Sequence, residues 1–119
     1  MIRILLIDDD PDIRTVMSAL LKNRNYEVET ASSKEDAFKM LKAYTPSLIL
    51  MDVLLSGADG REICREIKAN DQLKQIPVIM FSGHPSAADK IDSYGADDFI
   101  SKPFNVDALL EKIHKHVPQ

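Results

Sequence analysis

Acidic, hydroxyl and amino side chains in this sequence stand directly after short apolar runs. They are Asp8 to Asp10 after the first run, Asp52 after the third, Ser82 after the fourth and Lys102 after the fifth. If the runs are strands of one open α/β sheet, their carboxyl ends meet at one edge and bring these side chains together. Closely packed carboxylates repel one another, so such a cluster calls for a cation, either Lys102 or a metal ion.

The types of these side chains favour magnesium if a metal binds among them. The candidate ligands are all oxygen atoms, and Mg²⁺ prefers a few carboxylates together with water and phosphate. A carboxylate beside Mg²⁺ can attack phosphorus and form an aspartyl phosphate, with Asp52 as the candidate nucleophile. A metal held by Asp9, the Lys102 ammonium and the Ser82 hydroxyl could then stabilise the charge on the outer phosphoryl oxygens.

Each of these residues alone also has an ordinary structural explanation. Asp8 to Asp12 could be a solvated turn with the acidic residues that helix starts prefer. Asp52 and Ser82 could be turn residues, and Lys102 could be a solvated surface lysine. The case for a functional site therefore depends on the four strand ends together.

Apolar runs alternate with amphipathic segments along the whole chain, which predicts a strand followed by a helix, repeated five times. Strands separated by helices need right-handed crossovers and form a parallel sheet, and apolar central strands indicate helices on both faces. The expected strands are Ile2–Ile7, Tyr26–Thr30, Ser47–Met51, Pro77–Phe81 and Asp98–Ser101. The expected helices cover 11–21, 34–44, 59–69, 86–94 and 106–117, with Ser33 and Asn105 as caps.

The composition fits one domain over residues 1–119 and argues against several classes of protein. A net charge of −4 argues against general nucleic-acid binding. The apolar runs are of strand length, so no membrane span is expected. The single cysteine, Cys64, excludes an internal disulfide and a cysteine-based zinc site. A reducing cytoplasm is the expected location.

The residues at the strand ends resemble the landmarks of the response-regulator receiver domain of two-component signalling. The landmarks come in order over essentially the whole chain: Asp8-Asp9, then Asp52, then Ser82, and last Lys102-Pro103-Phe104. Each motif alone is weak, but their combination with this order of strands and helices is specific. The resemblance implies a flavodoxin-like, doubly wound (βα)5 three-layer sandwich with parallel strand order 2-1-3-4-5.

The resemblance assigns a role to each residue of the acidic cluster. Asp52 corresponds to the residue that accepts phosphate from a phosphohistidine of a partner. Asp9 and Asp52 are then expected to bind Mg²⁺ directly, Asp8 through water, and Leu54 through its backbone carbonyl. Lys102 is expected to pair with Asp52 and afterwards with the phosphoryl group.

Ser82 and Phe99 stand at the switch positions of the receiver pattern. Ser82 completes the catalytic set with Asp52 and Lys102, and its hydroxyl is expected to turn toward a phosphoryl oxygen while Phe99 moves inward behind it. By the same resemblance, this movement changes the surface formed by the fourth helix, the fifth strand and the fifth helix. The Lys102–Pro103 bond is expected to be cis, which X-Pro bonds allow.

The sequence departs from the usual receiver pattern at three places. Leu55-Ser56 stands where Met-Pro is usual, which should loosen the loop without removing a catalytic group. Ser82 stands where Thr is commoner and keeps the hydroxyl. Phe99 stands where Tyr is often found, so the switch can work by burial of the ring but has no phenol to report it.

The expected partners are a sensor histidine kinase or histidine phosphotransfer protein and, downstream, an output partner or an appended effector domain. The chain is expected to be a signalling switch that catalyses only its own phosphorylation and dephosphorylation, with no direct binding of nucleic acid or membrane. It could be a stand-alone domain or the first part of a longer regulator, and a monomer or a phosphorylation-promoted homodimer.

Two other functions fit parts of the same pattern. Ile7-Asp8-Asp9-Asp10 also matches the strand and Asp-x-Asp pattern of haloacid-dehalogenase phosphatases, in which Asp8 would be the nucleophile and Asp52 would have no role. The chain is short for that fold with a cap. A receiver-like adaptor that works without phosphorylation is the other alternative, but such domains typically lose the metal-binding Asp or the Lys.

Overall fold

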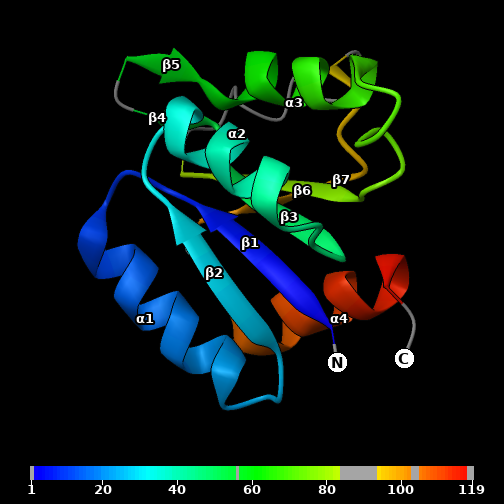
Figure 1. Cartoon of the computed structure of the whole chain (residues 1–119). Coiled ribbons are helices and arrows are strands. Elements are labelled where there is room, and N and C mark those ends of the chain that lie inside the picture. The colour runs from blue at the N-terminus through cyan, green and yellow to red at the C-terminus, as the bar shows by residue number, and fades with distance from the viewer. Residues whose placement is uncertain (1, 56, 84–93, 103–104, 118–119) are drawn as a thin grey trace.

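A five-stranded parallel sheet forms the centre of the computed structural model, which describes residues 2–55, 57–83, 94–102 and 105–117 (Figure 1). The strand order is β2-β1-β3-β6-β7, and every neighbouring pair is parallel. β6 and β7 are the fourth and fifth strands of this sheet along the chain, so the predicted order 2-1-3-4-5 is confirmed. The strands are β1 (Arg3–Ile7), β2 (Glu27–Ala31), β3 (Leu48–Asp52), β6 (Val78–Ser82) and β7 (Asp98–Ser101).

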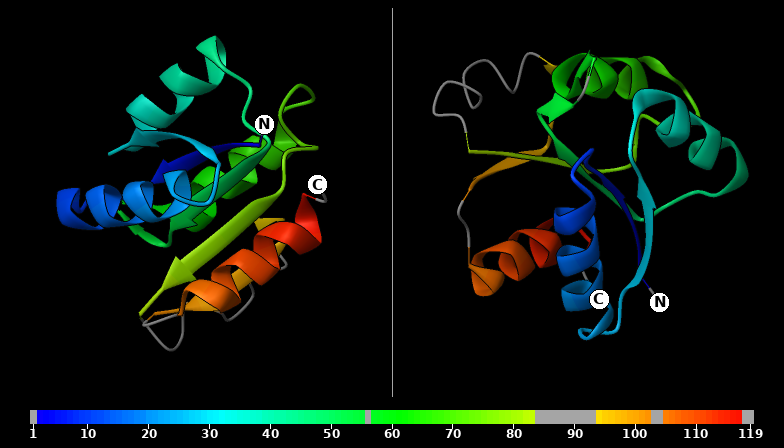
Figure 2. Two further views of the ribbon diagram at one scale, coloured as in Figure 1. Left: turned by 90° about the horizontal axis from the view of Figure 1, so that it is seen from below. Right: turned by 90° about the vertical axis from the view of Figure 1, so that its left-hand side faces the viewer.

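Helices cover both faces of the sheet and give the molecule three layers (Figure 2). α1 (Pro11–Lys22) and α4 (Val106–His116) lie on one face and share a core cluster with apolar strand residues. α2 (Lys34–Ala43) and α3 (Gly60–Ala69) cover the other face in a second cluster. The predicted three-layer sandwich is confirmed for these elements. The helix expected over 86–94 lies outside the described residues, apart from its last position, Tyr94.

Each of these four described helices begins at a polar residue whose side chain accepts a hydrogen bond from a backbone N–H group of the first turn. The N-caps are Asp10, Ser33, Asp59 and Asn105, of which Ser33 and Asn105 are the predicted ones. Pro11 takes the first helical position of α1, where a missing N–H costs nothing. In the part of the chain that the structure describes, no helix is long and apolar enough to cross a membrane.

Three strands end one residue later than predicted, namely β2 at Ala31, β3 at Asp52 and β6 at Ser82. β3 includes Asp52, which pairs with Phe81, and β6 includes Ser82, which pairs with Ser101 of β7. The prediction that Asp52 and Ser82 follow their strands is therefore wrong by one residue. The cause is that ladder pairing continues past the last apolar side chain, and its effect is that the sheet holds both residues.

A short antiparallel hairpin follows β3 and was not predicted. β4 (Leu54–Leu55) pairs with β5 (Ala58–Asp59), and Gly57 adopts a φ of 72° in the connection. A φ in this range suits glycine because it has no Cβ. Leu55 is buried against the α2–α3 core, which anchors the hairpin beside the end of β3. Leu54, Leu55, Ala58 and Asp59 are therefore held by strand pairing next to Asp52.

Cys64 of α3 lies in the same core and is fully buried. Burial disfavours the thiolate and raises the pKa of this thiol to about 11. Its role in the described structure is packing, and at neutral pH it stays protonated.

Candidate functional site

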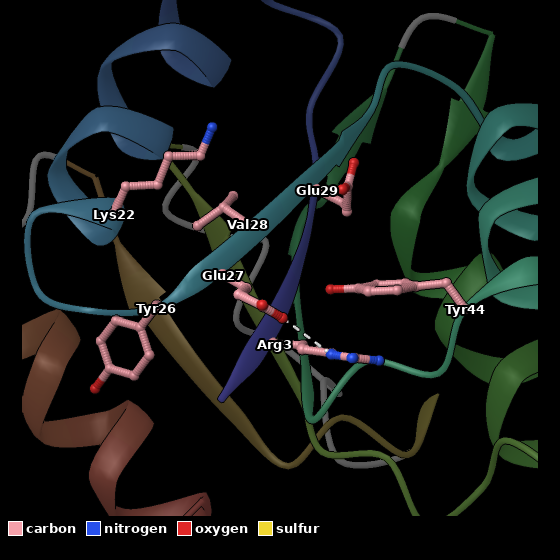
Figure 3. A pocket seen from close by; sticks show the side chains of 7 residues that line it. All are labelled: Arg3, Lys22, Tyr26, Glu27, Val28, Glu29 and Tyr44. Atoms are coloured by element: carbon pink, nitrogen blue, oxygen red, sulfur yellow. Dashed lines mark hydrogen bonds and ion pairs between the residues drawn. The ribbon is translucent and has the colours of Figure 1, made fainter. Parts of the chain in front are cut away.

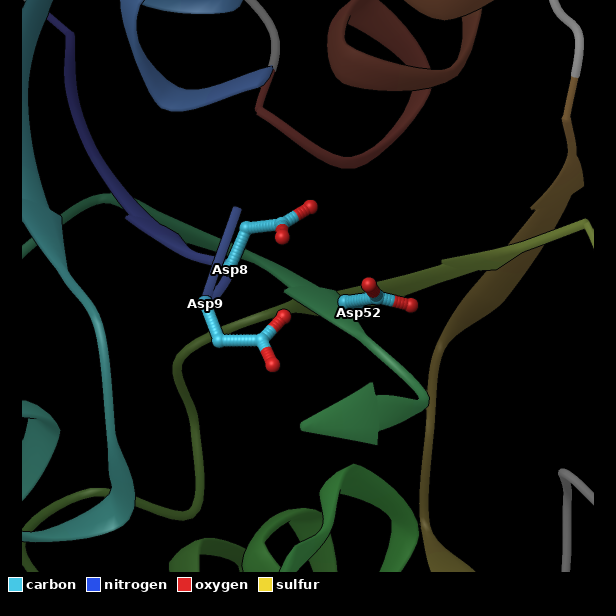
Figure 4. A group of neighbouring side chains, drawn as sticks. All are labelled: Asp8, Asp9 and Asp52. Atoms are coloured by element: carbon cyan, nitrogen blue, oxygen red, sulfur yellow. The ribbon is translucent and has the colours of Figure 1, made fainter. Parts of the chain in front are cut away.

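Three carboxylates from two adjacent strands converge at the carboxyl edge of the sheet. Asp8 and Asp9 follow β1, and Asp52 ends β3, its neighbour in the sheet. Each offers one oxygen atom, and these atoms lie within 4.8 Å of one another. In Figure 4 the three side chains lie next to one another where β1 and β3 end. The predicted acidic cluster is thus confirmed as a geometrical group.

Asp8 is the most buried member of the cluster, with no exposed surface. Its Oδ1 accepts a hydrogen bond from the Asp10 N–H over 2.9 Å. Its Oδ2 is also buried and has no hydrogen-bond partner in the described part of the chain. The pKa of Asp8 is raised, mainly by burial and further by the charges of Asp52 and Asp9. The hydrogen bond from the Asp10 N–H and the charge of Lys102 lower it in part.

Asp52 is nearly buried but keeps 8% of its surface exposed. Its Oδ1 accepts from the Leu54 N–H over 3.3 Å, so the hairpin orients the carboxylate. Burial raises the pKa of Asp52, although Lys102 and the Leu54 N–H both favour the charged form. The carboxylate therefore sits in a dry environment that a further positive charge would stabilise.

Lys102 brings a cation to the carboxylates at this edge. Its backbone N–H donates to the carbonyl of Ser82 over 2.9 Å, which continues the pairing of β6 with β7. Its Nζ lies 3.5 Å from Asp52 Oδ2 and 3.7 Å from Asp8 Oδ2, and 4.8 Å from the centre of the Phe81 ring. One ammonium is thus shared by two carboxylates at long distance, which leaves net negative charge at the edge. The predicted cis Lys102–Pro103 bond lies outside the described residues.

The donor set fits a hard divalent cation. Three carboxylates within reach of one another would be unfavourable without more positive charge. The buried Oδ2 of Asp8 accepts no hydrogen bond from the described residues, and its one ion pair, with Lys102 at 3.7 Å, is long. Oxygen donors of this kind suit Mg²⁺. Asp8, Asp9 and Asp52 are therefore brought together as candidate ligands, while the part expected of the Leu54 carbonyl stays a prediction.

Ser82 and Phe99 lie on the neighbouring strands β6 and β7. Ser82 ends β6 and is 4% exposed. Phe99 pairs with Met80 across β6 and β7 and is a half-buried ring packed against the α2–α3 core. Their predicted switch roles require movement and stay predictions.

Gly60 is a residue of the site whose close contact with Asp52 was not predicted from the sequence. Its N–H donates to the Val53 carbonyl over 2.7 Å, and its Cα lies against the backbone of Asp52. A Cβ at this position would collide with the Asp52 carbonyl oxygen and lie 3.1 Å from the Met80 methyl group. The only signal in the sequence was a glycine directly after a capping Asp59.

Basic side chains surround Asp98 at the other end of the sheet, where β7 begins. Asp98 accepts from Lys112 Nζ and His116 Nε2, each over 2.9 Å, and Lys115 Nζ lies 3.9 Å away. Burial alone would raise the pKa of Asp98, but the bonds from His116, Lys112 and the Phe99 N–H lower it to about 2. The cluster fastens α4 to β7, a role for His116 that the sequence did not predict.

A polar hollow of about 570 Å³ lies at the edge of β2, away from the carboxylate cluster (Figure 3). Arg3 pairs with Glu27 over 3.0 Å inside it, and Tyr44 lines one side. Its other charged residues are Lys22 and Glu29, so the two signs balance. This hollow has no converging charge of one sign, unlike the edge that carries Asp52.

The sequence over residues 4–114 matches the response regulator receiver domain family. This chain belongs to that family. The acidic pair after β1, the Asp at the end of β3 and the Lys after β7 stand together in the receiver domain as the resemblance implied.

Two curated relatives are transcriptional regulators. The receiver domain is 41% identical to the transcriptional regulatory protein AfsQ1 of Streptomyces coelicolor over 84% of this chain and 44% of that protein. It is 34% identical to the DNA-binding dual master transcriptional regulator RpaA of Synechocystis over 93% of this chain and 47% of that protein. The chain thus spans less than half the length of these relatives.

A relative of known structure has the same fold and was solved with a bound ligand. The response regulator TrrA of Thermotoga maritima, in complex with Mg²⁺-BeF, is 32% identical and superposes with a TM-score of 0.88. The match covers 98% of this chain and 99% of that one.

Proposed function

We propose that residues 1–119 form one receiver domain that accepts a phosphoryl group on Asp52 with the help of Mg²⁺. The observation that carries the proposal is that Asp8, Asp9 and Asp52 converge within 4.8 Å, with Lys102 Nζ 3.5 Å from Asp52. The complex of TrrA with Mg²⁺-BeF supports a metal at such a site in a relative. The domain is a signalling switch, and its catalysis is limited to its own phosphorylation and dephosphorylation.

The proposed chemistry assigns one task to each residue. A carboxylate oxygen of Asp52 attacks the phosphorus of a phosphohistidine, the new P–O bond forms, and the P–N bond breaks with its electron pair left on the imidazole. The Lys102 ammonium and the Ser82 hydroxyl donate to the phosphoryl oxygens as charge spreads over them. Mg²⁺ bound by Asp9, Asp52 and the Leu54 carbonyl, with Asp8 through water, would supply the remaining positive charge.

The output of the domain would follow from the same residues. Ser82 would turn toward the phosphoryl group and Phe99 would move inward, which changes the surface of β7, α4 and the segment before β7. The molecule that binds this changed surface would be an output partner, an appended effector domain or a second copy of the chain. A histidine kinase or phosphotransfer protein of the cytoplasm would be the donor.

Magnesium removal gives the direct test of this proposal. Wild-type protein incubated with acetyl phosphate and Mg²⁺ is expected to gain the mass of one phosphoryl group, and excess chelator is expected to abolish the gain. Intact-mass spectrometry measures both. Labelling that is equal with and without chelator, or no labelling at all, would contradict the proposal.

An apolar hollow next to Lys102 is the proposed docking place of the phosphodonor protein. The hollow has a volume of about 520 Å³ and lies between α1 and the start of α4. Val16, which lines it, is 64% exposed although it is a large hydrophobic residue. Lys102 borders both this hollow and Asp52, so a protein that delivers phosphate to Asp52 would cover Val16 as it approaches.

Val16→Glu tests this docking place. The buried charge is expected to slow phosphoryl transfer from a phosphorylated histidine kinase that labels the wild type, by about tenfold or more. Labelling by acetyl phosphate, which needs no docking, should stay within about twofold of the wild type. Thr15→Glu adds the same charge at the next exposed position of α1, outside the hollow, and serves as the matched control. Equal transfer to both variants would place docking elsewhere.

A further inference from the structure

Arg14 reaches back from α1 to the backbone of Asp8. Its Nη1 donates to the Asp8 carbonyl oxygen over 2.7 Å in a partly buried contact. Helical side chains tilt toward the N-terminus of their helix. The Arg14 side chain therefore extends past Pro11, the first residue of α1, toward Asp8. Hydrogen bonds from charged donors are short and strong. The contact therefore joins α1 to the peptide that links Asp8 to Asp9.

Asp8 is held at three of its polar atoms. Its N–H donates to the Ala31 carbonyl over 3.1 Å, its own carbonyl accepts from Arg14, and its Oδ1 accepts from the Asp10 N–H over 2.9 Å. The bond to the carbonyl fixes the rotation of the Asp8–Asp9 peptide. That rotation sets the direction in which the two side chains leave the backbone, and hence where their carboxylates lie relative to Asp52.

We propose that Arg14 is a positioning residue for the cation site, which holds the Asp8–Asp9 peptide so that both carboxylates face Asp52 before a cation arrives. The inference rests on the proposed function, because it concerns the magnesium ligands of the same site. Crowded carboxylates repel one another, so without this hydrogen bond the peptide can turn and the ligands move apart. Residues that orient metal ligands from outside the coordination sphere contribute about 10- to 100-fold in metal affinity.

Two substitutions of similar length separate the hydrogen bond from the bulk of the side chain. Arg14→Met removes the donor, and Arg14→Lys keeps a charged one. Mg²⁺ alone is titrated into unphosphorylated protein, and binding is followed by the amide NMR shifts of Asp9 and Asp10. We expect Arg14→Met to weaken Mg²⁺ binding about tenfold or more and Arg14→Lys to recover it to within about threefold of the wild type. Arg24→Met makes the same change at an exposed arginine just beyond α1, and should bind like the wild type.

A readout without metal tests the cause directly. The Asp10 amide, which donates to Asp8 Oδ1, should exchange its hydrogen faster in Arg14→Met than in the wild type if the peptide turns more freely. Should Arg14→Met fail to fold, Arg14→Gln takes its place under the same criterion. The inference would be overturned if Arg14→Met bound Mg²⁺ within about twofold of the wild type. It would also be overturned if Arg14→Lys lost as much Mg²⁺ affinity as Arg14→Met.

The outcome for the wild type keeps the two proposals apart. A wild type that is phosphorylated on Asp52 and binds Mg²⁺, together with an unchanged Arg14→Met variant, overturns the role of Arg14 alone. A wild type that neither binds Mg²⁺ nor gains a phosphoryl group overturns the proposed function and the inference with it.

Discussion

Asp52→Asn is expected to abolish phosphorylation of this chain altogether. The amide lacks the charged oxygen that attacks phosphorus. Within the described cluster, Asp52 is the carboxylate that belongs to a strand and lies 3.5 Å from Lys102 Nζ. The measurement is the intact mass after incubation with acetyl phosphate and Mg²⁺, in which the wild type gains one phosphoryl group and the variant gains none. Circular dichroism checks that the variant is folded.

Asp8→Asn is the matched control for this experiment, and it distinguishes the receiver mechanism from the phosphatase alternative. In the receiver mechanism Asp52 remains as the nucleophile, so Asp8→Asn should still be labelled, though more slowly. In a haloacid-dehalogenase mechanism Asp8 would carry the phosphoryl group. Labelling that survives in Asp52→Asn and disappears in Asp8→Asn would therefore reverse the assignment. A wild type that is never labelled would favour the adaptor alternative.

Gly60→Ala is expected to lower the free energy of unfolding by about 3 kcal/mol, a large effect for one methyl group. The added Cβ would collide with the carbonyl oxygen of Asp52, a backbone atom that β3 holds in place. Either the start of α3 or the end of β3 must shift, and both positions bear on the Asp52 carboxylate. Chemical denaturation measures the loss, and slower labelling by acetyl phosphate should accompany it.

Gly83→Ala is the control for this substitution. Gly83 is also close to the site, but among the described residues a Cβ there would meet only the Lys102 Cβ at 3.7 Å, an ordinary contact. We expect its unfolding free energy to stay within about 0.5 kcal/mol of the wild type. If Gly60→Ala were equally mild, the close approach of Gly60 to Asp52 would have no energetic importance.

The layers of the fold were predictable because each central strand is an unbroken apolar run. Leu48 to Met51 and Val78 to Phe81 are fully buried in the structure, as strands covered on both faces must be. The ends of these strands were less predictable, because Asp52 and Ser82 are polar yet continue the ladder. Hydrogen-bond pairing of the backbone does not depend on side-chain polarity.

The acidic cluster was predictable for a topological reason. Parallel strands deliver the residues after their carboxyl ends to one edge, so Asp8 and Lys102 could be placed near Asp52 without knowledge of any contact. The distances could not be predicted. In particular, the sequence did not reveal that Lys102 is shared between two carboxylates, or that Oδ2 of Asp8 is buried and accepts no hydrogen bond from the described residues.

The features that escaped prediction depend on contacts between distant residues. The β4–β5 hairpin has strands of two residues, too short to show a period of two. The approach of Gly60 to Asp52 depends on how α3 starts. The attachment of His116 to Asp98 joins positions 18 apart on different elements. None of these contacts leaves a local pattern in the chain.

The burial of Cys64 makes this domain a clean background for chemical labelling. Reaction with maleimides and disulfide probes requires an accessible thiolate, and the only cysteine of the sequence is enclosed, with its pKa raised to about 11. A cysteine introduced at the exposed Val16, in the docking hollow, would thus be the one reactive thiol. A fluorophore or spin label attached there would report contact with a phosphodonor without any need to remove the native residue.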